Sequence, residues 1–230
     1  MRALSAGLEH LGRRAAGRYG RIADEAGELA LLAARAVRSL ATPPWETRVW
    51  LAQMEQIGVR SFGVAAITTV FTGMVLALQT ALALPGLGVK YYIGTVVSKS
   101  TVRELVPVLV ALIVGGRIGS GMTAEIGTMK VTEQVDAMRA MAADPVRKLV
   151  VPKLAAALVM LPALTLIGDV LGILGGLVIA VLQLQLTASF YWNDVISALT
   201  LEDFASGLGK SLFFAFFITI VACHNGLTAR

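Results

Sequence analysis

The sequence has 230 residues, of which 56% are hydrophobic and 15% are charged, and its net charge is +5. Its mean hydropathy is +0.74, whereas soluble domains contain only about 45–50% apolar residues even when glycine is counted. The single cysteine, Cys223, excludes an intrachain disulfide, and two histidines argue against a metal site. These values exclude an ordinary soluble domain and predict an all-α polytopic membrane protein.

The chain begins with an Ala- and Arg-rich arm, residues 1–43, which lacks the apolar core and cleavage site of a secretory signal peptide. The arm is compatible with a loosely amphipathic helix, and the sequence "TPP" is expected to end it. The next segment, 45–58, places Trp50, Met54 and Ile57 at i, i+4 and i+7. We interpret it as an interfacial helix on the cytoplasmic face, with an ordinary cytoplasmic helix as the alternative.

Four apolar stretches are long enough to cross a bilayer, because a spanning helix needs about 20 mainly apolar residues. They cover residues 61–84, 91–116, 150–182 and 204–224. Backbone groups in hydrocarbon must be paired within the segment, so these stretches are expected to be helices; no barrel-like alternation is visible. The third stretch carries a small-residue stripe that favours close helix packing, formed by Gly168, Gly172 and Gly176.

The positive charges flank the predicted spans unevenly. Residues 1–60 hold nine Lys and Arg side chains and residues 115–153 hold six, whereas residues 183–203 hold none. The positive-inside tendency therefore predicts that the N-terminus and the segment 117–153 face the cytoplasm. Because these cations border spans instead of forming a patch with interleaved aromatic residues, we exclude nucleic acid as a partner.

A polar stretch, residues 124–142, lies between the second and third spans and is expected to end before Asp144-Pro145. A stripe with helical spacing predicts that it is one amphipathic cytoplasmic helix; the stripe consists of Thr128, Val131, Val135, Met138 and Ala142. Such a helix either lies on the membrane surface or docks in a groove of a soluble partner. Both interpretations remain open from the pattern alone.

The sequence "GRIGSGMT", residues 116–123, nearly fits a phosphate-binding loop. Met122 stands where that loop requires lysine, and the segment follows a membrane helix instead of a strand. We therefore predict that this chain binds no nucleotide and that any ATP is held by another subunit. The glycines are expected to form a flexible exit from the second span.

The second span contains Lys99, Arg103 and Glu104, and charges at membrane depth usually face a bundle interior or an aqueous cavity. One interpretation is a polar lining that meets a substrate headgroup. The other is that Lys99 snorkels to the interface while Arg103 and Glu104 form structural ion pairs. For Asp169 in the third span, a structural hydrogen bond or pairing with Arg103 is favoured over a proton relay. No nucleophile–base arrangement is visible, so no enzymatic activity is expected.

Several segments together resemble one family. The stretch "ELVPVLVALIVGGRIGSGMTAEIGTMKVTEQVDAM", then "DPVRKLVVPK", "LVMLPALTLIGDVLGILGG" and "CHNGL", is similar to the signature of the MlaE-type (YrbE-type) permeases. These are membrane subunits of ABC transporters that move lipids between bacterial membranes. The resemblance covers roughly residues 44–227 and implies a permease domain over 44–230, in the bacterial inner membrane.

The resemblance also implies partners and site residues. Two permease copies would form a lipid cavity at their interface, and each would contact a cytoplasmic ATPase, which holds ATP and Mg²⁺, through the helix 124–142. An MCE-domain protein is the usual periplasmic partner, and some systems add a STAS-domain subunit. The expected ATPase-coupling residues are Glu125, Met129, Lys130, Glu133, Gln134 and Met138. The expected lipid-cavity residues are Gln79, Lys99, Arg103 and Glu104.

Family members normally form a fifth span after the "C-x-x-G" segment, whereas this sequence contains four predicted spans and stops at Arg230. Either the chain is truncated there or this member lacks the fifth span. The predicted function is ATP-driven movement of lipid, in particular phospholipid, in a Gram-negative-type envelope. Two alternatives are an ion- or proton-coupled secondary transporter and a non-transporting scaffold for the ATPase and the MCE-domain partner.

Overall fold

The computed structural model describes residues 23–40, 47–83 and 92–229, and within these ranges the chain is helical and contains no strand. A helix over 23–40 is followed by α2 (Thr47–Met54), α3 (Arg60–Ala83), α4 (Ile93–Ser100), α5 (Val106–Val131), α6 (Gln134–Ala140), α7 (Val151–Leu182), α8 (Ala188–Ala198) and α9 (Leu201–Leu227). Three π-helical turns lie between them: η1 (Glu55–Val59), η3 (Thr101–Leu105) and η4 (Val146–Val150).

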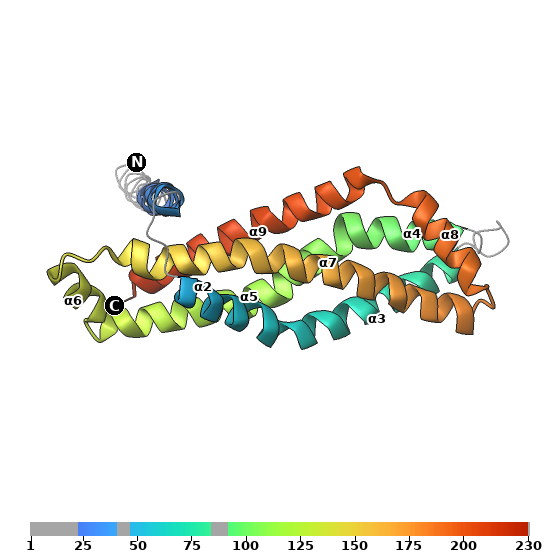
Figure 1. Ribbon diagram of the computed structural model, residues 1–230, viewed down its shortest axis with the longest axis horizontal. Helices are drawn as coiled ribbons and strands as arrows, with labels where there is room; N and C mark the ends of the chain where they lie inside the picture. Colours follow the sequence, from blue (N-terminus) through green and yellow to red (C-terminus); the bar gives the residue numbers. More distant parts are fainter. Residues whose placement is uncertain (1–22, 41–46, 84–91, 230) are drawn as a thin grey trace, which may run out of the picture.

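The four predicted spans are confirmed as helices long and apolar enough to cross a membrane. They lie within continuous helices over Thr47–Ala83, Ile93–Val131, Val146–Leu182 and Leu201–Leu227. Figure 1 shows an elongated bundle in which α7 runs nearly the full length of the molecule, with α8 at one end and α6 at the other. The predicted all-α polytopic fold is therefore correct.

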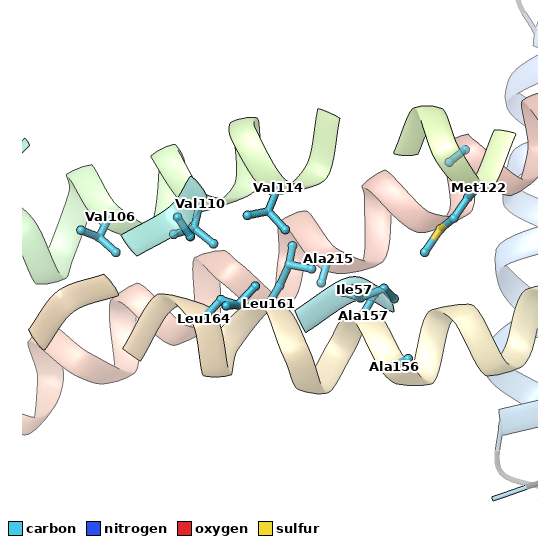
Figure 2. Packing of buried hydrophobic residues seen from close by; sticks show 12 residues of the cluster. Ile57, Val106, Val110, Val114, Met122, Ala156, Ala157, Leu161, Leu164 and Ala215 are labelled. Atoms are coloured by element: carbon cyan, nitrogen blue, oxygen red, sulfur yellow. The ribbon is translucent and has the colours of Figure 1, made fainter. Parts of the chain in front are cut away.

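The core of the bundle forms where α5, α7 and α9 meet. Figure 2 shows Val110 and Val114 of α5 facing Leu161 and Leu164 of α7, with Ala215 of α9 between them. These side chains are almost fully buried. The valine and leucine side chains pack around the small alanine at the density typical of protein interiors. This close packing fixes the three helices relative to one another.

Helices α3 and α7 approach each other through glycine. Gly168, Gly172 and Gly176, the stripe singled out in the sequence, lie in this contact and in the neighbouring contacts with α4 and α5. A methyl group on Gly176 would lie 2.7 Å from both the Tyr191 hydroxyl and Val97. On the facing helix, a methyl group on Gly73 would overlap the Gly172 carbonyl oxygen. The two backbones therefore touch directly, as small-residue interfaces in lipid allow.

Substituting Gly73→Ala is expected to destabilise the bundle by about 1–3 kcal/mol, because overpacking against rigid backbone forces α3 and α7 apart. The measurement is thermal or SDS-induced unfolding of the purified chain in mild detergent. Gly63→Ala is the matched control, since Gly63 lies on the same helix and its added methyl group meets nothing within 4 Å. Equal stability of the two variants would contradict direct backbone contact at Gly73.

The predicted interfacial helix is not a separate element. α2 continues through the π turn η1 into α3 without a break, and Figure 1 shows the chain changing direction there. A π turn adds one residue to the helix and bends it while keeping its hydrogen bonds, so neither proline nor a loop is needed. The placement of α2 in the membrane interface stays a prediction; Trp45 and the "TPP" sequence lie outside the described residues.

The expectation of a flexible glycine exit after residue 116 is wrong. The whole "GRIGSGMT" segment is α-helical and belongs to α5, which continues to Val131. Its small residues serve packing instead: Gly119 lies against Ile218 and Ala222 of α9, and the Thr123 hydroxyl donates a hydrogen bond to the Ala222 carbonyl, 3.0 Å away. Close approach to α9 therefore explains Gly119, whereas a methyl group added to Gly116 or Gly121 would meet nothing within 4 Å.

The predicted single helix over 124–142 is also wrong. α5 ends at Val131, Glu133 adopts a left-handed backbone conformation with φ of 60°, and the shorter helix α6 follows. The predicted stripe is consequently split, with Val131 62% exposed and Val135 fully buried. The Lys130 ammonium bonds the Asp136 carboxylate across this turn, 2.7 Å away. In one continuous helix these residues, six positions apart, would point in different directions.

Candidate functional site

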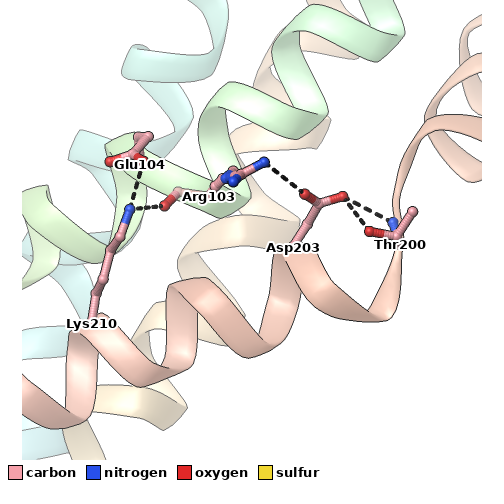
Figure 3. A network of polar contacts seen from close by, with 5 residues as sticks. All are labelled: Arg103, Glu104, Thr200, Asp203 and Lys210. Carbon is pink, nitrogen blue, oxygen red and sulfur yellow. Dashed lines mark hydrogen bonds and ion pairs between the residues drawn. The ribbon is translucent and has the colours of Figure 1, made fainter.

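Two pairs of opposite charge connect η3 to α9. Glu104 Oε1 lies 2.6 Å from Lys210 Nζ, and Arg103 Nη1 lies 3.8 Å from Asp203 Oδ1 (Figure 3). We call these four residues the charged network. π-helical turns widen a helix locally and often occur at functional sites, and η3 projects its two consecutive charged side chains toward the same neighbouring helix.

Proline chemistry explains why Lys210 is held at this point. Pro107 has no backbone N–H and cannot donate to the carbonyl of Arg103, four residues earlier. Lys210 Nζ donates to that carbonyl oxygen over 2.9 Å instead, as Figure 3 shows. The lysine thus satisfies a backbone group in the span while it pairs with Glu104.

Asp203 is fixed at the start of α9 by a capping box. Its Oδ2 accepts hydrogen bonds from the Thr200 backbone N–H, at 3.0 Å, and from the Thr200 hydroxyl, at 2.8 Å. Such reciprocal caps satisfy donors at a helix N-terminus and hold the carboxylate in one orientation. Its other oxygen is thereby directed at Arg103.

The charged network is open to the outside of the single chain. The side chains of Arg103 and Glu104 are each 61% exposed. A groove of about 600 Å³ lies beside them, lined by Glu104 and Lys210 together with apolar residues such as Phe213 and Phe214. Charged side chains within spanning helices usually pair with one another and face a bundle interior or an aqueous cavity instead of lipid chains.

The sequence-predicted cavity residues fall into two places. Arg103 and Glu104 belong to the charged network, and exposed Lys99 lies near enough for its charge to act on the Asp203 carboxylate. Gln79 lines a second groove of about 600 Å³ on the α3 side, with Phe71, Thr72 and Leu105. η3 lies next to both grooves, since Leu105 lines one and Glu104 the other.

Sequence reasoning missed Asp203 and Lys210 as members of this site. The available signal was a lone lysine in the otherwise uncharged stretch of the fourth span. Asp169 is not the partner of Arg103, because Arg103 pairs with Asp203. Asp169 is 2% exposed, and its Oδ1 has no hydrogen-bond partner among the described residues.

The turn between α5 and α6 forms a protruding tip at one end of the bundle (Figure 1). Glu133 and Gln134 are exposed there, whereas Met129 and Met138 are half-buried. Two large apolar side chains are exposed beside them, Val131 at 62% and Met141 at 73%. These exposed side chains are accessible to another protein at this end of the chain.

Lys130 stabilises this tip from within. Its hydrogen bond to the Asp136 side chain, aided by the charges of Lys130 and Arg139, lowers the pKa of Asp136 below its ordinary value of 3.8. Folding lowers the pKa of Asp136, so the ion pair with Lys130 contributes fully to stability when the pH is above 3.8. That contribution is lost as the pH falls through the lowered pKa of the folded state. Lys130, predicted to contact the ATPase, is thus engaged inside its own chain.

Glu125, another predicted coupling residue, also has a partner within the bundle. Its Oε2 lies 2.6 Å from the ammonium of Lys153, which is 3% exposed, and that ammonium also donates to Gln53 Oε1 over 3.4 Å. The buried lysine therefore connects α5, α7 and α2. This contact was not visible in the sequence, because 28 positions separate Glu125 from Lys153.

Substituting Glu125→Gln is expected to destabilise the chain by about 1–3 kcal/mol, because it leaves the buried Lys153 charge without its counter-ion. Since Glu125 is partly exposed, the loss is smaller than for a fully buried ion pair. Unfolding in mild detergent measures the change. Adding Lys153→Met should recover part of the lost stability, since an apolar side chain needs no counter-ion. A double variant less stable than Glu125→Gln would contradict this explanation.

Most of the chain matches one known protein family. Residues 50–230 match the family described as Permease MlaE. The chain belongs to the MlaE permease family. A probable ABC transporter permease protein of Rickettsia typhi is 41% identical over 206 residues, which cover 90% of this chain and 80% of that protein. Membership in the MlaE family confirms the resemblance predicted from the sequence and makes this chain an ABC transporter permease.

Two further relatives extend the comparison across the MlaE family. A probable ABC transporter permease protein of Synechocystis is 43% identical over 178 residues, covering 77% of this chain and 68% of that protein. The intermembrane phospholipid transport system permease protein MlaE of Haemophilus influenzae is 35% identical over 175 residues, covering 76% of this chain and 67% of that protein. The charged network and the tip lie within the family match, whereas the helix over 23–40 precedes it.

Proposed function

We propose that this chain is the membrane-spanning subunit of an ATP-driven transporter that moves phospholipid between membranes. The observation that carries the proposal is the charged network, which is exposed on the single chain between two largely apolar grooves and lies in helices long and apolar enough to cross a membrane. A phospholipid has the matching chemistry, since its charged headgroup suits the network and its acyl chains suit the grooves. The name of the Haemophilus relative supports this cargo.

A second copy of the chain covers this surface in the proposed assembly. Two networks then face a shared cavity, and neither meets the hydrocarbon of the bilayer. The chain supplies no catalytic residues; a separate ATPase holds ATP and Mg²⁺. That ATPase docks at the tip formed by the α5–α6 turn, through Glu133, Gln134 and the exposed side chains of Val131 and Met141.

The proposed orientation follows the distribution of positive charge. The N-terminus and the tip lie in the cytoplasm of a bacterial inner membrane, and α8 lies on the periplasmic side. An MCE-domain lipid-binding protein then meets the periplasmic side, and a STAS-domain subunit is a further cytoplasmic partner. In this arrangement the tip transmits motion of the ATPase to the second and third spans, which it connects directly.

Purification of the intact complex in mild detergent, followed by native mass spectrometry, tests the proposal. We expect two copies of this chain, an ATPase and co-purified phospholipid, and ATP-dependent phospholipid transfer after reconstitution. Gradient-driven transport by vesicles that contain this chain alone would favour a secondary transporter. Undiminished transfer when the charged network is neutralised would favour a scaffold.

A further inference from the structure

Two arginines meet in a small pocket far from the charged network. Arg60 begins α3, Arg117 lies in α5, and both line a pocket of about 170 Å³ together with Gln53 and Gln56. At 1.5 Å of rise per residue, Arg117 lies about 20 Å along its helix from Arg103. We propose that this pocket binds the phosphate group of an anionic phospholipid, a second lipid site separate from the grooves.

The donors in the pocket fit a phosphate. None of the described residues that line it is acidic. Neither arginine lies within ion-pair distance of a carboxylate in the described part of the chain. Arg117 Nη1 donates to the Arg60 carbonyl and to the Ser61 hydroxyl, the latter at 2.9 Å, which fixes the guanidinium in place. Its Nε–H and Nη2 groups donate to none of the described residues, and guanidinium donors match phosphate oxygens in geometry and charge.

Gln53 is oriented by the buried lysine beside the pocket. Its Oε1 accepts a hydrogen bond from Lys153, so its amide N–H groups are the donors that remain. The charge of Lys153 is balanced by Glu125, at 2.6 Å. No carboxylate of the described residues balances the charge of the two pocket arginines, and an anion would neutralise it.

The position of the pocket favours a lipid source for this phosphate. Arg60 directly precedes the uncharged run of the first span, and Arg117 directly follows the last apolar residues of the second. Both therefore lie where a bilayer changes from hydrocarbon to headgroups. The pocket also has apolar walls from Ile57 and Met122, and its volume is about ten times the 10–15 Å³ that one ordered water needs.

Arginine modification by phenylglyoxal, read by mass spectrometry on the full-length chain in neutral detergent, tests this site locally. We expect phosphatidylglycerol to slow modification of Arg60 and Arg117, but not of Arg48, which is exposed on α2 and does not line the pocket. Diacylglycerol with the same acyl chains should protect none of the three. Arg60→Gln should raise the phosphatidylglycerol concentration needed to protect Arg117 about tenfold, the loss expected for one charge-assisted contact.

Two further measurements distinguish a lipid headgroup from free phosphate as the ligand of this pocket. If inorganic phosphate protects the two arginines only at much higher concentration than phosphatidylglycerol, the ligand is the lipid headgroup. If the two compounds protect at equal concentrations, the ligand is free phosphate. Arg117→Lys, which keeps the charge, should retain partial protection of Arg60. Equal protection of Arg48, or no protection of Arg60 and Arg117, would overturn the proposal. Neither result depends on transport, so the outcome is independent of the proposed function.

Discussion

Glu104→Lys is expected to lower ATP-driven phospholipid transfer by about tenfold or more in reconstituted vesicles. The substitution replaces an ion pair of 2.6 Å with two cations at the same place, and Lys210 remains tied to the Arg103 carbonyl. Repulsion between the two cations then pushes η3 away from α9 and opens the charged network. Transfer of labelled phospholipid between donor and acceptor vesicles measures the effect.

A charge swap makes this prediction specific. The double variant Glu104→Lys with Lys210→Glu restores opposite charges and should regain a large part of the lost transfer, although its lysine can no longer reach the Arg103 carbonyl from α9. Glu202→Lys is the matched control, because Glu202 is exposed on α9 and lies outside the network. Equal loss in the swap and in the single variant would mean that the pairing itself is unimportant.

Glu133→Lys is expected to uncouple ATP hydrolysis from transport while the membrane helices stay folded. Glu133 is exposed in the turn between α5 and α6, so reversing its charge alters the proposed docking surface without disturbing the core. We expect at least about a tenfold drop in transport per ATP hydrolysed, consistent with losing a charge pair at an interface. Simultaneous assays of phosphate release and lipid transfer measure this ratio.

The control for Glu133 lies at the same end of the molecule. Glu25→Lys makes the same charge change on the exposed surface of the helix over 23–40, outside the tip. It should leave the ratio unchanged. A wild-type ratio of transport to ATP hydrolysis in Glu133→Lys would show that the ATPase does not depend on this residue. An equal defect in both variants would indicate a general electrostatic effect instead of a docking contact.

Span lengths and helical class were predictable because both depend on local properties of the chain. An uncharged run such as 61–84 is long enough to cross a bilayer whatever surrounds it. The glycine stripe in α7 was equally visible, since its spacing places the three residues on one helix face. The function class followed from the family signature, which spans contiguous sequence.

Contacts between distant segments could not be predicted in the same way. Lys210 and Arg103 are 107 positions apart, and their contact depends on how η3 packs against α9. The π turns add single residues that shift the face on which later side chains lie, a change that periodicity alone does not reveal. The break at Glu133 likewise brings Lys130 and Asp136 into contact across the turn, a contact that helical spacing does not reveal.

In the proposed assembly, the surface bearing the charged network faces a second copy of the chain and a phospholipid. Photo-crosslinking from p-benzoylphenylalanine at Phe213, which lines the groove beside Glu104, tests it most directly. In the intact complex we expect both a copy-to-copy product and a phospholipid adduct that decreases when ATP hydrolysis is trapped with vanadate. The same probe at Val159, 53% exposed on α7, should give no copy-to-copy product and an adduct insensitive to nucleotide. Identical products from both positions, unaffected by nucleotide, would contradict the account.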